Sequence, residues 1–370
     1  MKSPPFSIVA HSHLRWDFVW QRPQQVFSRL ATHHAVLFVE EPIYQPGHPH
    51  LRLLEAAPNI VRAIPVLPAP HAPEELCEAV LPLLRRALPS RPLVQWFYSP
   101  MCAPAMVGKL GESAVVYDCM DELANFRFAP PDLRVREQFL LKHANVVFTG
   151  GLGLYEAKSR EHPNVHFFGC GVDAQHYGKA RAPDTAVPAA VANLPGPVLG
   201  YFGVIDERLD YELIGAVADA YSGGSVVMAG PTAKVRPEEL PRQPNVHWLG
   251  QQAYADLPAL VKGFDVCLMP FALNEATRYI NPTKTLEYLA AGKPVVSTAI
   301  PDVARNFADV VRVAESPEDF IYAIRDLLHA GADPTPGLAR ANGATWDATV
   351  AAMRAHLLDA VRGRRALAAA

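Results

Sequence analysis

The sequence lacks several features that mark particular classes of protein. Its five cysteines form no Cys-x-x-Cys pair, and an odd, dispersed set is typical of reduced thiols rather than of a disulfide framework. The net charge of −3 provides no basic surface for a nucleic acid. No apolar run approaches the ~18 residues of a membrane span, and the N-terminus has no signal-peptide pattern. We therefore expect a cytoplasmic protein without nucleic-acid partners, and peripheral contact with a membrane stays open.

Short apolar strands alternate with amphipathic helical segments along the whole chain. The pattern predicts strands at Phe6–Ala10, Ala35–Glu40, Val94–Tyr98, Ala114–Tyr117, Val146–Thr149, Val165–Phe168, Val198–Phe202, Ser225–Ala229, Val246–Leu249, Val266–Met269, Pro294–Thr298 and Val310–Val313. It predicts helices at Arg22–Ala31, Pro73–Leu88, Leu133–His143, Tyr211–Ala220, Asp256–Gly263, Thr283–Ala291, Pro317–His329 and Trp346–Arg362. Such alternation is typical of parallel sheets covered by helices.

The chain of 370 residues is too long for one ordinary core, and half of its residues are hydrophobic. A stretch rich in proline and alanine, residues 177–197, separates two similar halves. We predict an α/β protein with two Rossmann-like, doubly wound parallel-sheet domains facing a cleft. The predicted ranges are 1–178, 179–345 and a last helical segment, 346–370, which in folds of this class often crosses back to the first domain.

The segment Asn281–Thr298 carries the clearest chemistry. Pro282 is expected to open a helix, because proline suits the first helical position. Thr283 and Lys284 would then stand in the first turn, where free N–H groups and the helix dipole attract an anion such as phosphate. Glu287 follows one turn later on the same face as Lys284, where a carboxylate can accept hydrogen bonds from a diol such as a ribose. An ordinary amphipathic helix with an exposed Lys/Glu pair explains these residues equally well.

A resemblance to a known family favours the first interpretation. The stretch Glu287-Tyr-Leu-Ala-Ala-Gly-Lys-Pro-Val resembles the signature of retaining GT-B glycosyltransferases, especially the family-4-like group. Five further stretches resemble that group in the expected order: Ser7–Gln25, Val146–Lys158, Asn164–Asp173, Gly200–Gly203 and Val227–Pro231. The resemblance implies transfer of a sugar from a nucleotide diphosphate sugar to a saccharide or lipid-linked acceptor, with retention of configuration, in a bacterial polysaccharide or glycolipid pathway.

The resemblance also implies where the donor binds. Glu287 would hold the ribose, while Lys284 and the backbone of Thr283 would hold the diphosphate. The remaining donor-side candidates surround these positions: Gly203, Arg208, Tyr279, Asn281 and Pro282. The sequence departs from the family where a second glutamate usually precedes the helix glutamate by eight residues, because Tyr279 stands there and the nearest upstream carboxylate is Glu275. Recognition of the sugar should therefore differ from the common pattern.

Acidic residues follow an apolar strand of the first half. Asp118, Asp121 and Glu122 come directly after Ala114–Tyr117, at an edge where a carboxylate could bind acceptor hydroxyls or support the departing proton. We take Asp121 and Asp118 as catalytic candidates and Glu122 as an acceptor-side residue; helix caps or solvated loop acids are the alternative.

A second group of candidates follows the first strand. His13 is a further catalytic candidate, His11, Trp16 and Arg22 are acceptor-side candidates, and one of the two histidines is expected to line the cleft near the donor sugar. Arg22 would pair with a phosphate or an acidic acceptor; a surface position at the N-terminus of a helix is the alternative. The two histidines lack a third ligand for zinc. No Asp-x-Asp motif occurs in the sequence, which agrees with an enzyme that needs neither metal nor cofactor.

Two rival functions stay open. A nucleotide-sugar 2-epimerase uses the same architecture, but it needs catalytic acids beside the sugar. A non-catalytic module that only binds nucleotide sugars would carry the same donor residues. A nicotinamide site is disfavoured, because the Gly151-x-Gly153 stretch has Glu156 where the third glycine belongs.

Overall fold

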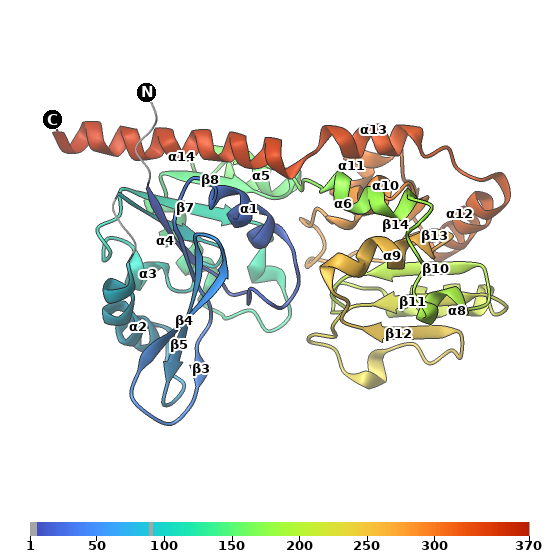
Figure 1. Cartoon of the computed structure of the whole chain (residues 1–370), viewed down its shortest axis with the longest axis horizontal. Coiled ribbons are helices and arrows are strands. Elements are labelled where there is room, and N and C mark those ends of the chain that lie inside the picture. The colour runs from blue at the N-terminus through green and yellow to red at the C-terminus, as the bar shows by residue number, and fades with distance from the viewer. Residues whose placement is uncertain (1–5, 89–91, 370) are drawn as a thin grey trace. The chain divides into compact units, whose positions relative to one another are not determined.

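The chain forms two compact units (Figure 1). The computed structural model describes residues 6–88 and 92–369, with side chains up to residue 363. Unit 1 comprises Met1–Gly169 and Asp347–Ala370, and unit 2 comprises Cys170–Trp346. The division thus falls after Gly169 rather than after residue 178, because the segment that follows joins unit 2. Val172 there pairs with Thr345 through a parallel bridge.

Unit 1 is built on a mainly parallel sheet with the order β3-β5-β2-β1-β6-β7-β8-β9. Its strands are β1 (Ser7–His11), β2 (Val36–Val39), β3 (Ile43–Tyr44), β4 (His50–Ala57), β5 (Ile60–Leu67), β6 (Leu93–Phe97), β7 (Ala114–Cys119), β8 (Val146–Thr149) and β9 (Val165–Phe167). Its helices are α1 (Arg22–Leu30), α2 (Pro73–Ala87), α3 (Ala103–Met106), α4 (Leu133–His143), α5 (Leu152–Lys158) and most of α14 (Trp346–Ala369). Central strands such as β1, β6 and β8 are buried along their whole length, which explains why apolar residues predominate in their sequences.

Strands β3, β4 and β5 were not predicted from the sequence. β4 is the antiparallel partner of β5, and the two are joined by a tight turn in which Asn59 adopts a φ of 64°. Most residues of β4 are exposed, so its sequence has no continuous apolar run from which a strand could be predicted. The turn residues Pro58 and Asn59 before an apolar run were the available signal.

Unit 2 has a fully parallel sheet with the order β12-β11-β10-β13-β14-β15. Its strands are β10 (Val198–Phe202), β11 (Ser225–Ala229), β12 (Val246–Gly250), β13 (Val266–Met269), β14 (Val295–Thr298) and β15 (Arg312–Ala314). Its helices are α6 (Ala174–Gly178), α7 (Ala189–Ala192), α8 (Tyr211–Ala220), α9 (Leu257–Lys262), α10 (Lys284–Ala290), α11 (Pro301–Phe307), α12 (Pro317–Ala330) and α13 (Thr335–Gly343). The prediction of two parallel-sheet domains is confirmed. In the part of the chain that the structure describes, no helix combines the length and the apolar character that crossing a membrane requires.

Helix α14 packs on unit 1 through two histidine contacts. Arg354 donates from Nε to Nε2 of His34 at 3.0 Å, while Nδ1 of His34 lies 3.0 Å from the carbonyl oxygen of Phe6. Because Nε2 accepts, it carries no proton, and His34 must be neutral in this arrangement. On the same helix, the ring of His356 stacks on that of His166 at 3.6 Å. A protonated His34 would place a second cation against Arg354, and protonation of both His166 and His356 would stack two cations.

Unit 1 is therefore expected to lose stability in mild acid. Burial lowers the pKa of His34 to about 4, with Arg354 adding to the effect, and burial likewise lowers the pKa of His11 to about 4. These groups take up protons more readily when unfolded, so their contribution is present above pH 6.5 and is lost as the pH falls toward 4. Between pH 7 and pH 5, each should cost roughly 2 kcal/mol in the free energy of unfolding. Urea unfolding at both pH values checks this: His34→Gln should flatten the pH dependence, and an unchanged slope would contradict the assignment.

Candidate functional site

The sheet of unit 2 changes its direction of growth between β10 and β13. From β10 the chain adds β11 and β12 on one side, and it then adds β13, β14 and β15 on the other. Loops that leave the carboxyl ends of two neighbouring strands at such a point form the crevice in which open α/β sheets bind ligands. Gly203 follows β10, and the segment 270–283 follows β13, so these donor-side candidates belong to the same edge of the sheet.

Lys284 and Glu287 lie on one face of α10, as the sequence predicted. Nζ of Lys284 is 2.7 Å from Oε2 of Glu287 and 3.3 Å from Oγ1 of Thr283. It also stands 4.8 Å above the ring centre of Phe202, the last residue of β10. Both side chains are largely buried, with 18% and 9% of their surface exposed. The pair therefore joins α10 to the end of β10 and is shielded from solvent, in contrast to an exposed surface pair.

The helix begins two residues later than expected. Pro282 lies outside α10, Thr283 is the N-cap residue and Lys284 is the first helical residue. The prediction that Pro282 occupies the first helical position is therefore wrong. The carbonyl oxygens of Pro282 and Thr283 still accept hydrogen bonds from the N–H groups of Thr285 and Glu287, at 3.3 and 3.2 Å. Lys284 thus remains in the first turn.

Two glycines allow the loops after β10 and β11 to approach closely. Gly203 and Gly230 have φ angles of 150° and 157°. A Cβ atom on Gly230 would come within 1.7 Å of the carbonyl oxygen of Gly203, and one on Gly203 would come within 3.1 Å of Cε of Lys284. Gly230 therefore makes room for the loop after β10, and Gly203 makes room for the side chains of Tyr201 and Lys284.

Arg208 also lies in the loop after β10. Its guanidinium group binds the carboxylate of Asp206 through Nε at 2.9 Å and through Nη2 at 2.7 Å. The carbonyl oxygen of Arg208 accepts from the N–H of Ala272 at 2.8 Å, which ties this loop to the one after β13. Asp206 thus holds and partly neutralises the guanidinium group of this donor-side candidate.

The segment between β13 and α10 is folded by its own polar side chains. Thr277 is buried; its Oγ1 donates to the carbonyl oxygen of Ala272 and accepts from the N–H of Asn274 at 3.1 Å. Tyr279 is half-buried, with the guanidinium group of Arg278 at 5.4 Å from its ring centre. This segment therefore presents an ordered tyrosine where the family usually has a glutamate.

The residues on either side of Tyr279 also make specific interactions. Arg278 pairs with the exposed Glu275 at 3.5 Å, so the nearest upstream carboxylate has a partner on the surface. The carbonyl oxygen of Asn281 accepts a hydrogen bond from Sγ of Cys170 at 3.2 Å. Cys170 and Thr277 were not singled out from the sequence, and only their places beside the quoted motifs could have indicated them.

In unit 1, Arg22 and Asp118 form a buried ion pair. The first residue of α1 donates to the carboxylate at the end of β7 from Nε at 3.0 Å and from Nη2 at 2.8 Å, and Nη1 donates to the carbonyl oxygen of Phe168 at 2.8 Å. Arg22 is 4% exposed and Asp118 is fully buried. Burial raises the pKa of Asp118, and the guanidinium group opposes that rise. This pairing changes the roles expected for both residues, because neither side chain is presented at the surface.

Glu122 belongs to a second buried network. Nζ of Lys158 lies 2.9 Å from Oε2 of Glu122 and 2.8 Å from Oε2 of Glu137. The hydroxyl group of Tyr117 donates to Oε1 of Glu137 at 2.6 Å. Glu122 therefore anchors the loop after β7 to α4 and α5. Asp121, which is half-buried, is the adjacent residue of this anchored loop and stays the catalytic prediction.

The candidates after β1 are mostly interior residues. His11 is buried, with Nε2 at 2.9 Å from Oε1 of Gln95 and its ring stacked on that of Phe97 at 4.6 Å. Trp16 is buried against Phe38, and its backbone N–H donates to Oε1 of Glu40 at 3.2 Å. These contacts within unit 1 are enough to explain why a histidine and a tryptophan stand at positions 11 and 16, without a role in ligand binding. His13 is half-buried, and its assignment stays a prediction.

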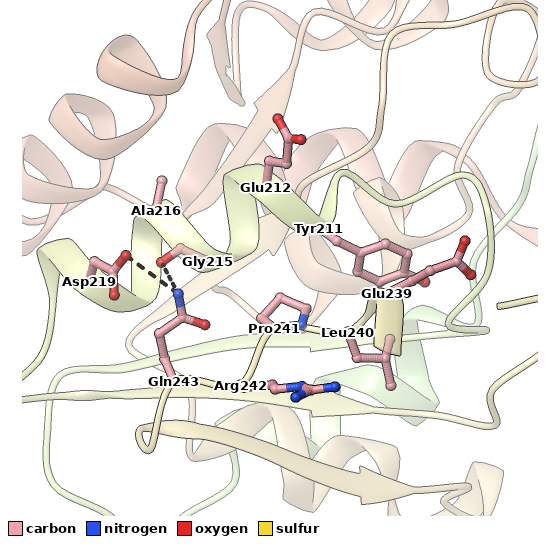
Figure 2. A pocket seen from close by; sticks show the side chains of 10 residues that line it. All are labelled: Tyr211, Glu212, Gly215, Ala216, Asp219, Glu239, Leu240, Pro241, Arg242 and Gln243. Atoms are coloured by element: carbon pink, nitrogen blue, oxygen red, sulfur yellow. Dashed lines mark hydrogen bonds between the residues drawn. The ribbon is translucent and has the colours of Figure 1, made fainter. Parts of the chain in front are cut away.

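A shallow groove of about 430 Å³ lies between α8 and the segment before β12 (Figure 2). The residues that line it are Tyr211, Glu212, Gly215, Ala216, Asp219, Glu239, Leu240, Pro241, Arg242 and Gln243. Nε2 of Gln243 bridges its two sides, at 3.4 Å from the carbonyl oxygen of Gly215 and from Oδ2 of Asp219. This lining is distinct from the donor-side residues at the edge formed by β10 and β13.

The sequence of unit 2 matches a known family. The family described as glycosyl transferases group 1 matches residues 197–330, a range that extends from the start of β10 to the end of α12. It therefore includes Gly203, Arg208, Lys284 and Glu287. Residues 197–330 are a group 1 glycosyl transferase domain.

A curated relative also matches part of this chain. TuaH of Bacillus subtilis, named as a teichuronic acid biosynthesis glycosyltransferase, is 31% identical over 178 residues. The aligned part makes up 46% of this chain and 44% of TuaH, so the match spans less than half of either protein.

Solved structures resemble the protein over nearly its whole length. HepE from Anabaena, in complex with UDP and glucose, has 14% identity and a TM-score of 0.69 over 96% of this chain and 99% of its own. A sucrose-phosphate synthase from Thermosynechococcus elongatus has 16% identity and a TM-score of 0.68 over 99% and 100%. An α,α-trehalose-phosphate synthase from Burkholderia xenovorans, in complex with glucose-6-phosphate, has 12% identity and a TM-score of 0.71 over 95% and 100%. At these identities the similarity shows the fold, and the predicted GT-B fold is confirmed. The match of residues 197–330 supports the predicted group of glycosyltransferases.

Proposed function

We propose that the protein transfers a sugar from a nucleotide diphosphate sugar to a saccharide or lipid-linked acceptor, with retention of configuration and without a metal ion. The observation that carries this proposal is the shielded Lys284–Glu287 pair on α10, at the switch point of a group 1 glycosyl transferase domain. Glu287 would accept hydrogen bonds from the ribose. Lys284 and the N–H of Thr283 would bind the diphosphate, whose developing charge they stabilise as it leaves.

The ligands of similar solved proteins support a nucleotide sugar as the donor. HepE was solved with UDP and glucose, and a trehalose-6-phosphate protein of E. coli was solved with UDP-2-fluoro glucose. The name of TuaH supports a polysaccharide acceptor. On the acceptor side, Asp121 is our candidate for contact with the reacting hydroxyl, since Asp118 and Glu122 are engaged in buried ion pairs.

Two measurements on the wild-type protein test the proposed function. In a thermal-shift panel, a nucleoside diphosphate and its sugar should raise the melting temperature, because a bound ligand stabilises by about RT ln(1 + [L]/Kd). Incubation of the stabilising nucleotide sugar with saccharide acceptors should then release the nucleoside diphosphate and a glycoside with the anomeric configuration of the donor, also in the presence of EDTA. An epimerised nucleotide sugar, or binding without any turnover, would contradict the proposal in favour of an epimerase or a binding module.

We also propose a cytoplasmic enzyme with peripheral membrane contact through unit 1. Phe128 is 81% exposed at a φ of 65°, although it is large and apolar. The adjoining helix α4 exposes Val135 between Arg134 and Lys142, a combination of apolar and basic side chains that suits an anionic lipid surface.

Exchange of the exposed aromatic residue tests the membrane contact. Phe128→Ser should weaken co-sedimentation with phosphatidylglycerol vesicles about tenfold, because burying one aromatic side chain contributes roughly 1.5 kcal/mol. Leu273→Ser, which removes an exposed apolar residue of unit 2, should leave vesicle binding unchanged. Equal binding by wild type and both variants would rule out this surface.

A further inference from the structure

Tyr177 is a neighbour of the Lys284–Glu287 pair that sequence reasoning did not identify. The sequence placed it at the end of the first domain, where the linker begins. In the structure it belongs to α6, a helix of unit 2 whose N-cap residue Asp173 accepts from the N–H of His176 at 2.9 Å. Helix α6 packs against α10, the helix that carries Glu287.

The ring of Tyr177 is fixed by aromatic contacts. It lies parallel to the ring of Phe202, with centres 6.0 Å apart and 11° between the planes, and it meets Tyr254 edge-on at 6.1 Å. Phe202 is also the ring beneath the ammonium group of Lys284. Tyr177 and Lys284 therefore contact the same residue at the end of β10. Only 1% of the surface of Tyr177 is exposed.

The hydroxyl group of Tyr177 is buried and makes no hydrogen bond of good geometry, although the carboxylate of Glu287 lies near enough to affect it. A buried hydroxyl group in this condition is unusual, because polar groups inside proteins are nearly always paired. After burial itself, the charge of Glu287 is the largest influence that raises the pKa of this hydroxyl group well above its ordinary value. Because α6 packs against α10, and Tyr177 and Lys284 contact the same ring of Phe202, this donor lies on the side of unit 2 that holds Glu287.

We propose that Tyr177 is a positioning residue of the nucleotide site, whose hydroxyl group donates to the Glu287 carboxylate when the diphosphate attracts Lys284. This inference rests on the proposed function. In the structure Lys284 supplies the donor to Oε2 of Glu287 at 2.7 Å. A bound diphosphate competes for that ammonium group and would leave a carboxylate that is 9% exposed short of a partner. A donor from Tyr177 keeps the carboxylate of Glu287 hydrogen-bonded and oriented as an acceptor for the ribose hydroxyl groups.

The variant Tyr177→Phe tests the inference, because it keeps the ring and removes only the hydroxyl group. By calorimetry with the nucleoside diphosphate that stabilises the wild type most, Tyr177→Phe should bind five- to tenfold more weakly. With the corresponding nucleoside, which has no phosphate to attract Lys284, the change should stay below twofold. The melting temperature of the ligand-free variant should not fall, since the deleted hydroxyl group makes no hydrogen bond of good geometry.

Two further proteins complete the experiment. Tyr221→Phe removes a hydroxyl group that donates to Ile321 elsewhere in unit 2, at 3.1 Å, and should bind like the wild type. In a Glu287→Gln background, adding Tyr177→Phe should change the affinity less than twofold. If wild type binds the nucleotide and Tyr177→Phe binds it equally well, or if nucleoside and nucleoside diphosphate are affected alike, the inference is wrong and the proposed function stands. If the wild type binds no nucleotide, the proposed function itself fails and the inference falls with it.

Discussion

Replacing Glu287 with alanine is expected to weaken the binding of a nucleoside diphosphate about 100-fold. Two hydrogen bonds from a ribose diol to an ionised carboxylate contribute roughly 1.5 kcal/mol each, and each 1.4 kcal/mol corresponds to a factor of ten in Kd. The effect should be this large because Glu287 is shielded from solvent, and water cannot readily replace the lost acceptor. Titration calorimetry with the nucleotide that stabilises the wild type most provides the measurement.

Glu275→Ala is the matched control for this variant. It removes an exposed carboxylate from the loop before α10, whose partner in the structure is Arg278. Its nucleotide affinity should stay within twofold of the wild type. If Glu287→Ala retains full affinity, the assignment of the ribose to α10 is wrong. If Glu275→Ala loses as much as Glu287→Ala, the loop takes part in nucleotide binding in a way that we did not infer.

Replacing Asp118 with alanine is expected to destabilise unit 1 by about 3–5 kcal/mol. The change leaves the guanidinium group of Arg22 buried without its carboxylate, and breaking a buried pair from one side costs about this much. For a unit of this size the melting temperature should fall by roughly 10 °C. Calorimetric or urea unfolding would show the loss in the transition of unit 1.

The double variant Arg22→Met, Asp118→Leu separates a structural role from a catalytic one. Replacing both members of a buried pair with apolar groups of similar volume is often close to neutral, so most of the lost stability should return. Asp347→Ala removes a surface pair with Arg29, in which Asp347 is 81% exposed, and should produce no measurable shift. If Asp118→Ala is as stable as this control, the buried pair does not support unit 1 in the way we infer.

The parallel sheets could be predicted from the sequence because their strands are buried on both faces. Strands such as β10, β11 and β13 are continuous apolar runs, and the prolines and glycines between them mark where each ends. Strand β4 escaped prediction for the opposite reason. β4 is an exposed edge strand, whose residues follow no alternation of apolar and polar side chains.

Residues near one another in sequence were placed correctly, whereas partners far apart were not. Lys284 and Glu287 are three residues apart, and helix geometry alone places them on one face. Arg22 and Asp118 are 96 residues apart, and no rule of sequence spacing could reveal that they form an ion pair with each other. The same limit applies to Tyr177, whose neighbour Glu287 lies on a helix far along the chain. Long-range pairing decides which charged side chains are left to bind a ligand.

Hydrogen exchange of the wild-type protein tests most directly whether the nucleotide binds at the edge formed by β10 and β13. The amides should be compared with and without a saturating nucleoside diphosphate. We expect slower exchange in residues 203–209 and 281–287, where the loop after β10 and the start of α10 would contact the ligand. Residues 239–243, which line the groove in Figure 2, should exchange as before. Protection confined to that groove or to unit 1, with residues 281–287 unaffected, would contradict the account.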